Sequence, residues 1–168
     1  MEDKKKDWAS RRKFILQSGL AVVAIPFTQI SCQNSNERKA IEENEDSFEF
    51  AFLTDIHIKP EMNAPKGFQM AIDKVNELKP DFVLTGGDLV YDTMRGNFDQ
   101  SESLFTLYKN MCKGFNMPVY NCIGNHDLFA IYEESPESED HPDYKYGMWE
   151  RHFGDTYYSF DHKGWHFI

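Results

Sequence analysis

The chain has 168 residues, 40% of them hydrophobic and 15% aromatic, which is enough for one globular domain with a packed core and too apolar for a generally disordered chain. Its formal net charge of −10 at pH 7 repels phosphate backbones at long range, which argues against a dedicated DNA- or RNA-binding protein. We therefore expect no nucleic-acid partner.

Residues 1–31 are expected to form an export signal. Arg11 and Arg12 stand just before Phe-Ile-Leu, and a mildly apolar stretch then runs to Ile30. This stretch is too short and too polar for a comfortable membrane span. The arrangement resembles the twin-arginine signal, whose translocase would be a partner during export. An ordinary positively charged signal or anchor is the alternative, and we expect an exported protein, periplasmic or lipid-anchored at the cell envelope.

Cys32 is a candidate lipidation site at the end of this segment. Ile30-Ser31-Cys32 resembles the lipobox at which a bacterial lipoprotein is cleaved and acylated, although Gln29 departs from the usual aliphatic residue. Acylation of Cys32 would make the membrane a partner of the protein. Residues 32–47 are polar and charge-rich with no apolar period, which predicts a flexible tether.

The segments after the tether alternate between strand and helix patterns. In chain order we expect a strand at 48–56, a helix at 65–79, a strand at 81–85, a helix at 99–113 and a strand at 119–123. The first strand is apolar enough to be buried on both faces, and Asp99 or Ser101 is expected to cap the second helix. Short connections in this order predict an α/β class with a parallel sheet and right-handed crossovers.

The last part of the chain predicts smaller elements. Residues 133–143 are acidic and contain two prolines, so they are expected to form an exposed loop. A short helix is expected at 144–153. Two short apolar segments, 157–161 and 165–168, predict a hairpin that turns at Lys163-Gly164.

Metal-binding residue types follow each of the three expected parallel strands. The clusters are Asp55-Ile56-His57, Gly86-Gly87-Asp88 and Gly124-Asn125-His126-Asp127. Because the carboxyl ends of neighbouring parallel strands lie side by side, we expect the clusters to converge on one crevice. Asp-x-His is a weak signal alone, because an Asp and a His two apart often occur by chance. Gly-Gly-Asp is weaker still, since turn glycines followed by a helix-capping Asp are common. The third is much rarer by composition, and the ordered set predicts a metal site.

The three clusters resemble the first three motifs of the calcineurin-like metallophosphoesterase superfamily, which run Asp-x-His, Gly-Asp and Gly-Asn-His-Asp/Glu. The expected hairpin also looks like the strand pair that follows them in bacterial members. The resemblance covers 48–168, which we interpret as a partial metallophosphoesterase domain. It implies an α/β sandwich fold and an enzyme that hydrolyses phosphate mono- or diesters, so that a phosphate ester is the expected substrate.

The resemblance assigns the metal ligands. Two metal ions would be held by Asp55, His57, Asp88 and Asn125. Asp55 and His57, two apart at an extended strand end, would point the same way. Asp88 would bridge both ions through its two oxygens, and Asn125 would offer a neutral carbonyl oxygen. Imidazole, carboxylate and amide ligands together favour Fe, Mn or Zn, without a choice among them.

The resemblance gives the end of the third motif a different role. His126 would steady the transition state or protonate the leaving oxygen, and Asp127 would orient it by accepting its other N–H. Tyr91 also matches Gly-Asp-x-x-Tyr of the purple acid phosphatases, where this tyrosine binds ferric iron. Here His57 would fill that coordination position, so Tyr91 is expected to pack beside a ligand, with direct coordination as the alternative.

The last two motifs of the superfamily, a lone His and Gly-His-x-His, have no counterpart in this sequence. The other four histidines do not match these two motifs in context; they are His141, His152, His162 and His166. We expect a fold whose carboxyl-terminal half is missing, and a weak or inactive copy of a phosphoesterase. A non-catalytic, lipid-tethered module that binds metal or phosphate is the alternative function.

Overall fold

The computed structural model describes residues 47–168. The expected signal segment, the lipidation site at Cys32 and all but the last residue of the tether lie outside the described residues. Within residues 47–168, no helix combines the length and the apolar content that a bilayer span requires.

A parallel sheet forms the centre of the described part, as the strand and helix patterns predict. Its strands are β1 (Phe50–Leu53), β2 (Phe82–Thr85) and β3 (Val119–Tyr120). The strand order is β1-β2-β3, with Phe50 opposite Phe82 and Val83 opposite Val119. The predicted α/β class is confirmed, although the third strand is shorter than the predicted 119–123.

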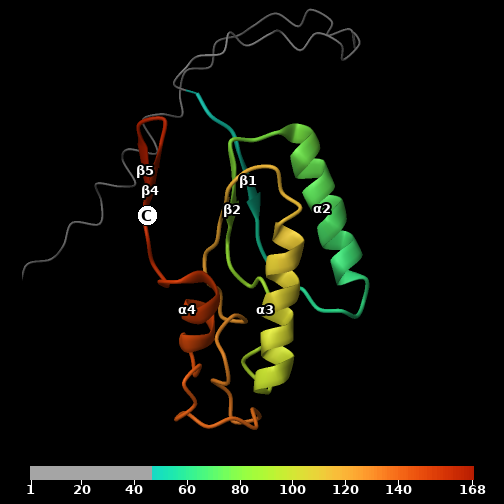
Figure 1. The fold of residues 1–168 in the computed structure, drawn as a ribbon, viewed down its shortest axis with the longest axis vertical. Coiled ribbons are helices and arrows are strands. Elements are labelled where there is room, and N and C mark those ends of the chain that lie inside the picture. The colour runs from blue at the N-terminus through green and yellow to red at the C-terminus, as the bar shows by residue number, and fades with distance from the viewer. Residues whose placement is uncertain (1–46) are drawn as a thin grey trace, which may run out of the picture. The chain divides into compact units, whose positions relative to one another are not determined.

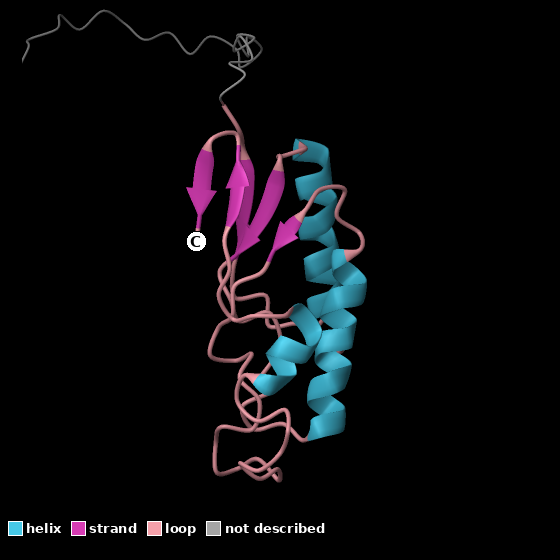
Figure 2. Ribbon diagram, turned by 60° about the vertical axis from the view of Figure 1, so that its left-hand side comes forward, coloured by secondary structure: helices cyan, strands magenta, loops and turns pink. Residues whose placement is uncertain are grey.

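Two long helices lie on one side of this sheet (Figures 1 and 2). They are α2 (Ala64–Leu78) and α3 (Phe98–Cys112), each within one residue of its prediction. The predicted cap at Asp99 or Ser101 is wrong. Asn97 caps α3 instead, because it has the extended backbone of a cap residue and its side chain accepts the N–H of Gln100 at 2.9 Å.

The buried core lies between these helices and the inner face of the sheet. Phe68 and Ile72 on α2 meet Phe105 and Tyr108 on α3, and Leu53 of β1 packs against them. Each fully buried side chain of this kind stabilises the fold by roughly 1.5–3 kcal/mol. The core therefore fixes the direction in which the strands deliver the loops beyond their carboxyl ends.

The outer face of the sheet is aromatic and is covered by the predicted hairpin, which is confirmed. The hairpin consists of β4 (Phe160–His162) and β5 (Trp165–Phe167), and it follows the short helix α4 (Gly147–Phe153). Phe82 packs edge-on against Phe160 and Phe167, with ring centroids 5.5 and 5.4 Å apart. Phe82 is consequently only 1% exposed.

The prediction that the first strand is buried on both faces is wrong. Phe50 and Phe52 are 45% and 58% exposed. Both lie on the outer face, since they pair with Phe82 and Leu84 of β2. The hairpin side chains cover the ring of Phe82 on the central strand and leave the outer face of β1 partly open.

Candidate metal centre

The loops that leave β1 and β2 run side by side toward the expected site. His57 N–H donates to the Asp88 carbonyl at 2.9 Å, and Ile58 N–H donates to the Leu89 carbonyl at 2.9 Å. The same two loops close with a parallel bridge between Ile58 and Val90. These bonds continue the ladder of the sheet beyond its strands, so they hold the first two clusters at a fixed separation.

Three of the expected ligands have a left-handed backbone. The φ angles are 54° at Asp55, 45° at His57 and 53° at Asp88. β1 ends at Leu53, so the prediction that Asp55 and His57 point the same way along an extended strand is wrong in its geometry. Left-handed φ angles are uncommon for residues other than glycine, and such residues gather where the surrounding structure imposes a functional geometry.

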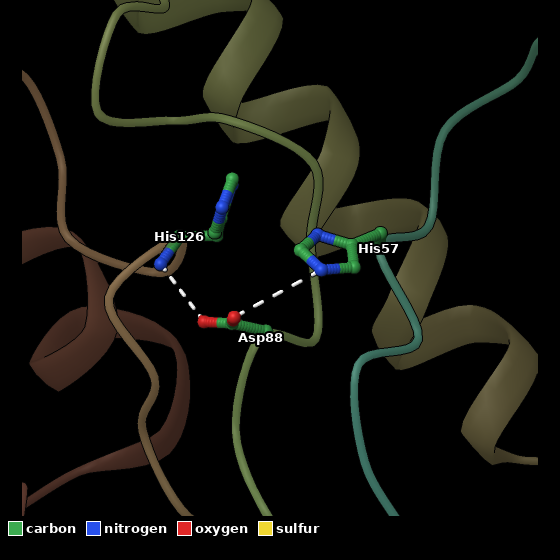
Figure 3. Close-up of side chains that lie close together, drawn as sticks. All are labelled: His57, Asp88 and His126. Carbon is green, nitrogen blue, oxygen red and sulfur yellow. Dashed lines mark hydrogen bonds and ion pairs between the residues drawn. The ribbon is translucent and has the colours of Figure 1, made fainter.

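The side chains of these loops nevertheless converge. Nε2 of His57 lies 3.8 Å from Oδ1 of Asp55 and 3.9 Å from Oδ2 of Asp88. Ligand atoms of His57, Asp88 and His126 all lie within 4.8 Å of one another (Figure 3). The His57 and His126 rings stand nearly perpendicular, with centroids 4.5 Å apart. The three predicted clusters therefore meet at one place.

The donor set fits a divalent transition-metal ion. Nδ1 of His57 and Nδ1 of His126 are buried, and neither has a hydrogen-bond partner among the described residues. Buried polar atoms of folded proteins are nearly always paired, so these two nitrogens call for an explanation. The His57 nitrogen nearest the carboxylates of Asp55 and Asp88 is the other one, Nε2. Imidazole nitrogens together with carboxylate oxygens are ligands that Mn, Fe and Zn accept.

Glycines allow the third loop to press against Asp88. The His126 N–H donates to Oδ1 of Asp88 at 2.9 Å. A Cβ atom on Gly124 would lie 2.2 Å from that same Oδ1, and one on Gly87 would lie 2.7 Å from the Gly124 Cα. No side chain fits in either place. The Asp88 carboxylate thus has one oxygen fixed by the backbone and the other turned toward His57.

Asp127 has a different role from the predicted one. Its Oδ1 accepts the N–H groups of Leu89 and Val90 at 2.8 and 3.0 Å, and its Oδ2 accepts that of Gly124 at 2.8 Å. Its side chain is therefore occupied by backbone donors of two loops, and His126 Nδ1 has no partner among the described residues. The prediction that Asp127 orients the His126 ring is wrong, because its oxygens join the loops instead.

Burial raises the pKa of Asp127 to about 6, against the effect of its backbone donors, and the charge of Asp88 raises it further. The residue is completely buried. A carboxyl group in this position gives the loops their spacing at an electrostatic cost.

Asn125 is exposed and lies between Gly124 and His126 in the chain. Its amide nitrogen lies 3.9 Å from the Met94 sulfur. With the nitrogen turned to that sulfur, the carbonyl oxygen is the atom that remains to bind a cation.

Tyr91 lies beside His57, as expected of a residue that packs against a ligand. The two rings meet edge to face with centroids 6.4 Å apart, and Tyr91 is 43% exposed. The Lys59 ammonium lies 3.6 Å above the Tyr91 ring. A cation in this position occupies one face of the tyrosine and holds the ring next to the cluster.

One further residue supports the site and was not predicted from the sequence. Thr93 is completely buried, and its hydroxyl and its N–H both donate to the His126 carbonyl, at 2.7 and 3.2 Å. Thr93 therefore holds the third loop against the second. Its role depends on the approach of two loops that are far apart in the chain, and no local pattern predicts such an approach.

A parallel sheet with histidine and aspartate side chains gathered beyond its carboxyl edge is an arrangement that can hold metal ions. The chain belongs to the calcineurin-like phosphoesterase family, whose model matches residues 48–166. No curated protein sequence matches the chain. The predicted family and its α/β fold are confirmed. Membership implies hydrolase chemistry on phosphate esters that depends on divalent metal ions.

Proposed function

We propose that the chain hydrolyses phosphate mono- or diesters at a site for two metal ions. The observation that carries this proposal is the convergence of His57, Asp88 and His126 within 4.8 Å, at the ends of three neighbouring strands. Each residue comes from a different loop, and the backbone hydrogen bonds between the loops fix their spacing. Family membership supports the reaction class.

Asp55, His57, Asp88 and Asn125 would hold the ions, which we propose to be Fe, Mn or Zn because the donors are imidazole, carboxylate and amide groups. When bound, such ions polarise the phosphoryl oxygens and activate water for attack on phosphorus. The chain itself holds Asp88 ready through the His126 N–H. The second oxygen of Asp88 lies 3.9 Å from Nε2 of His57, which supports the proposal that the two side chains would share an ion.

His126 would act on the substrate through its ring. We assign it the protonation of the leaving oxygen, or the steadying of charge in the transition state. Its ring lies close enough to Asp88 and His57 to bind a cation as well. His126→Ala distinguishes a role on the substrate from a role as a metal ligand. If His126 acts on the substrate, Mn²⁺ affinity should stay within about threefold while turnover falls about a hundredfold or more. A parallel loss of Mn²⁺ affinity would make His126 a ligand.

The test of the reaction is hydrolysis of nitrophenyl phosphate and bis-nitrophenyl phosphate by the full chain with added Mn²⁺. Asp88→Ala is expected to lower Mn²⁺-dependent turnover by at least about a hundredfold. Loss of a residue that only hydrogen-bonds to a metal ligand already lowers metal affinity or activity about ten- to a hundredfold. Asp73→Ala removes an exposed carboxylate on α2 and is the matched control, with turnover expected to match the unsubstituted chain.

Two outcomes contradict this proposal. Turnover that is indifferent to Asp88→Ala would place the chemistry elsewhere. Mn²⁺ binding that requires Asp88, without turnover of either ester, would favour the alternative of a non-catalytic module that binds metal or phosphate.

We also propose export by the twin-arginine translocase and a lipid anchor at Cys32, so that the protein is periplasmic or held at the cell envelope. This proposal is supported by the sequence alone. Cys32→Ala should move the protein from the membrane fraction to the soluble fraction of a bacterial host. Replacement of Arg11 and Arg12 by lysine should keep the protein in the cytoplasm, and export despite both replacements would favour an ordinary signal.

A further inference from the structure

A cavity lies next to the metal centre, and the proposed chemistry does not use it. It has a volume of about 500 Å³ and lies between the loop after β1, the loop after β2 and the first turns of α3. Tyr91 lines this cavity and also packs against His57, with ring centroids 6.4 Å apart. One side chain therefore borders both the cavity and the cluster, so a ligand in the cavity lies beside the metal centre.

The charges that line the cavity balance one another. Lys59 and Arg95 are the cations, and Glu61 and Asp92 are the anions. Arg95 is paired with Asp92 at 2.8 Å, and with Glu134 at 3.8 Å. Lys59 lies over the Tyr91 ring at 3.6 Å. Such a lining provides donors and acceptors but no net field, so it does not favour a second strongly charged group.

The walls of the cavity are of two kinds. Met62 and Leu104 supply apolar surface together with the Tyr91 ring, and Met62 is 82% exposed. Gln100 and Ser103, on the first turns of α3, supply an amide and a hydroxyl. An apolar wall with a few polar groups is the usual composition of a site for a small organic molecule. The charged groups around it exclude a long acyl chain.

Ser101 gives an independent sign of a ligand. It lines the cavity and is completely buried, and its hydroxyl has no hydrogen-bond partner among the described residues. The adjacent wall is glycine, where a Cβ on Gly96 would lie 2.6 Å from Oγ of Ser101. A buried hydroxyl without a partner is costly, so its retention at a cavity wall calls for an acceptor or donor from outside the chain.

From these features we infer that the cavity binds the leaving group of the substrate, and that this group is an uncharged ring bearing hydroxyl or amide groups. A nucleoside and a monosaccharide both have this chemistry, with a flat apolar face for Met62 and Leu104 and polar groups for Ser101 and Ser103. The inference rests on the proposed function, since it places the phosphate at the metal centre and the rest of the ester in the cavity.

The test is calorimetric binding to the full chain with Mn²⁺, using inorganic phosphate, adenosine 5′-monophosphate and glucose 6-phosphate as probes. At least one of the two esters is expected to bind about tenfold more tightly than phosphate. Ser103→Trp, on the exposed side of α3, would fill the cavity and abolish this surplus while leaving phosphate binding unchanged. Thr106→Trp is the matched control, since Thr106 is exposed on the same helix outside the cavity and should keep the surplus.

Ser101→Ala sharpens the test because the hydroxyl has no partner in the folded chain. The substitution is expected to leave the melting temperature unchanged or higher and to weaken binding of the favoured ester about three- to tenfold.

The two esters distinguish the kinds of leaving group. A larger gain over phosphate for adenosine 5′-monophosphate would identify a nucleoside, and a larger gain for glucose 6-phosphate would identify a sugar. The inference is overturned if neither ester binds more tightly than phosphate, or if Ser103→Trp leaves the surplus intact. Absence of Mn²⁺-dependent turnover, with the surplus present, would overturn the reaction and not the cavity.

Discussion

Two aspartates join chain segments at opposite edges of the same sheet, and their electrostatic surroundings differ. Asp127, beyond β3, is completely buried and accepts three backbone N–H groups, and burial raises its pKa to about 6. Asp81, just before β2, accepts the Glu49 N–H and pairs with Lys163 at 3.0 Å. That backbone bond, followed by the bond from Lys163, lowers the pKa of Asp81 to about 2.

The difference shows that the carboxylates at the carboxyl edge of the sheet lack a cationic partner. The hairpin supplies a cation to Asp81, whereas Asp55 and Asp88 have no ion pair with lysine or arginine in the part of the chain that the structure describes. The basic side chains near Asp88 are the imidazoles of His57 and His126. Carboxylates gathered without a cationic side chain repel one another unless a cation is bound. We conclude that the carboxyl edge of the sheet is arranged for an ion from outside, and the amino edge is complete in itself.

The largest effect should come from Asp127→Ala. The substitution leaves the N–H groups of Leu89, Val90 and Gly124 without their acceptor, and each unsatisfied buried donor costs about 1–3 kcal/mol. We expect the free energy of unfolding to fall by about 3–5 kcal/mol, measured by urea denaturation. Asp73→Ala, which removes an exposed carboxylate on α2, is the control. A loss below about 1 kcal/mol would show that water replaces the carboxylate.

Binding of Mn²⁺ at the same edge should raise the free energy of unfolding. An ion that binds only the folded chain stabilises it by about 2.7 kcal/mol at a hundred times its dissociation constant, so the unfolding midpoint should rise with Mn²⁺ concentration. Gly124→Ala should remove this response, because its Cβ would lie 2.2 Å from Oδ1 of Asp88. An equal rise in the Gly124→Ala and unsubstituted chains would mean that Mn²⁺ binds elsewhere.

Local periodicity explains why the helices could be predicted, and the parallel order of the strands explains why the meeting of the three clusters could be predicted. α2 and α3 are each shifted by a single residue from the prediction, since an apolar stripe fixes the body of a helix better than its ends. The parallel order of the strands was enough to bring His57, Asp88 and His126 together, because neighbouring strands end at one edge.

The details that decide the site depend on contacts between segments distant in the chain. Asp127 reads as a partner of His126 in the sequence, and only the approach of Leu89 and Val90, more than thirty residues earlier, shows that it is a backbone acceptor. The left-handed backbone of Asp55 likewise follows from its bond to the second loop, where its N–H donates to the Gly87 carbonyl at 3.2 Å. Residue type and spacing predict neither contact.

A smaller effect is expected from Asp81→Ala at the amino edge. The substitution removes the acceptor of the Glu49 N–H and the ion-pair partner of Lys163, both at the surface, where water replaces a lost partner more easily. We expect the free energy of unfolding to fall by about 1–2 kcal/mol, as for one or two ordinary hydrogen bonds. A loss as large as that of Asp127→Ala would remove the contrast between the two edges.

The smallest effect should be seen in acid, and it tests the sign of the electrostatics at Asp81. The pKa of this carboxyl falls from its ordinary value of 3.8 to about 2 on folding, so its charge stabilises the fold fully above pH 3.8, and this contribution is lost as the pH falls toward 2. Asp81→Asn keeps an acceptor for Glu49 and removes the charge. Its denaturation midpoint should therefore fall less steeply than that of the unsubstituted chain between these pH values, and the two chains should converge near pH 2. Asp73→Asn, without such a pairing to lysine, should follow the unsubstituted chain throughout. Parallel curves for Asp81→Asn and the unsubstituted chain would mean that the charge of Asp81 does not stabilise the fold, and that Asp81 acts only as the acceptor of the Glu49 N–H.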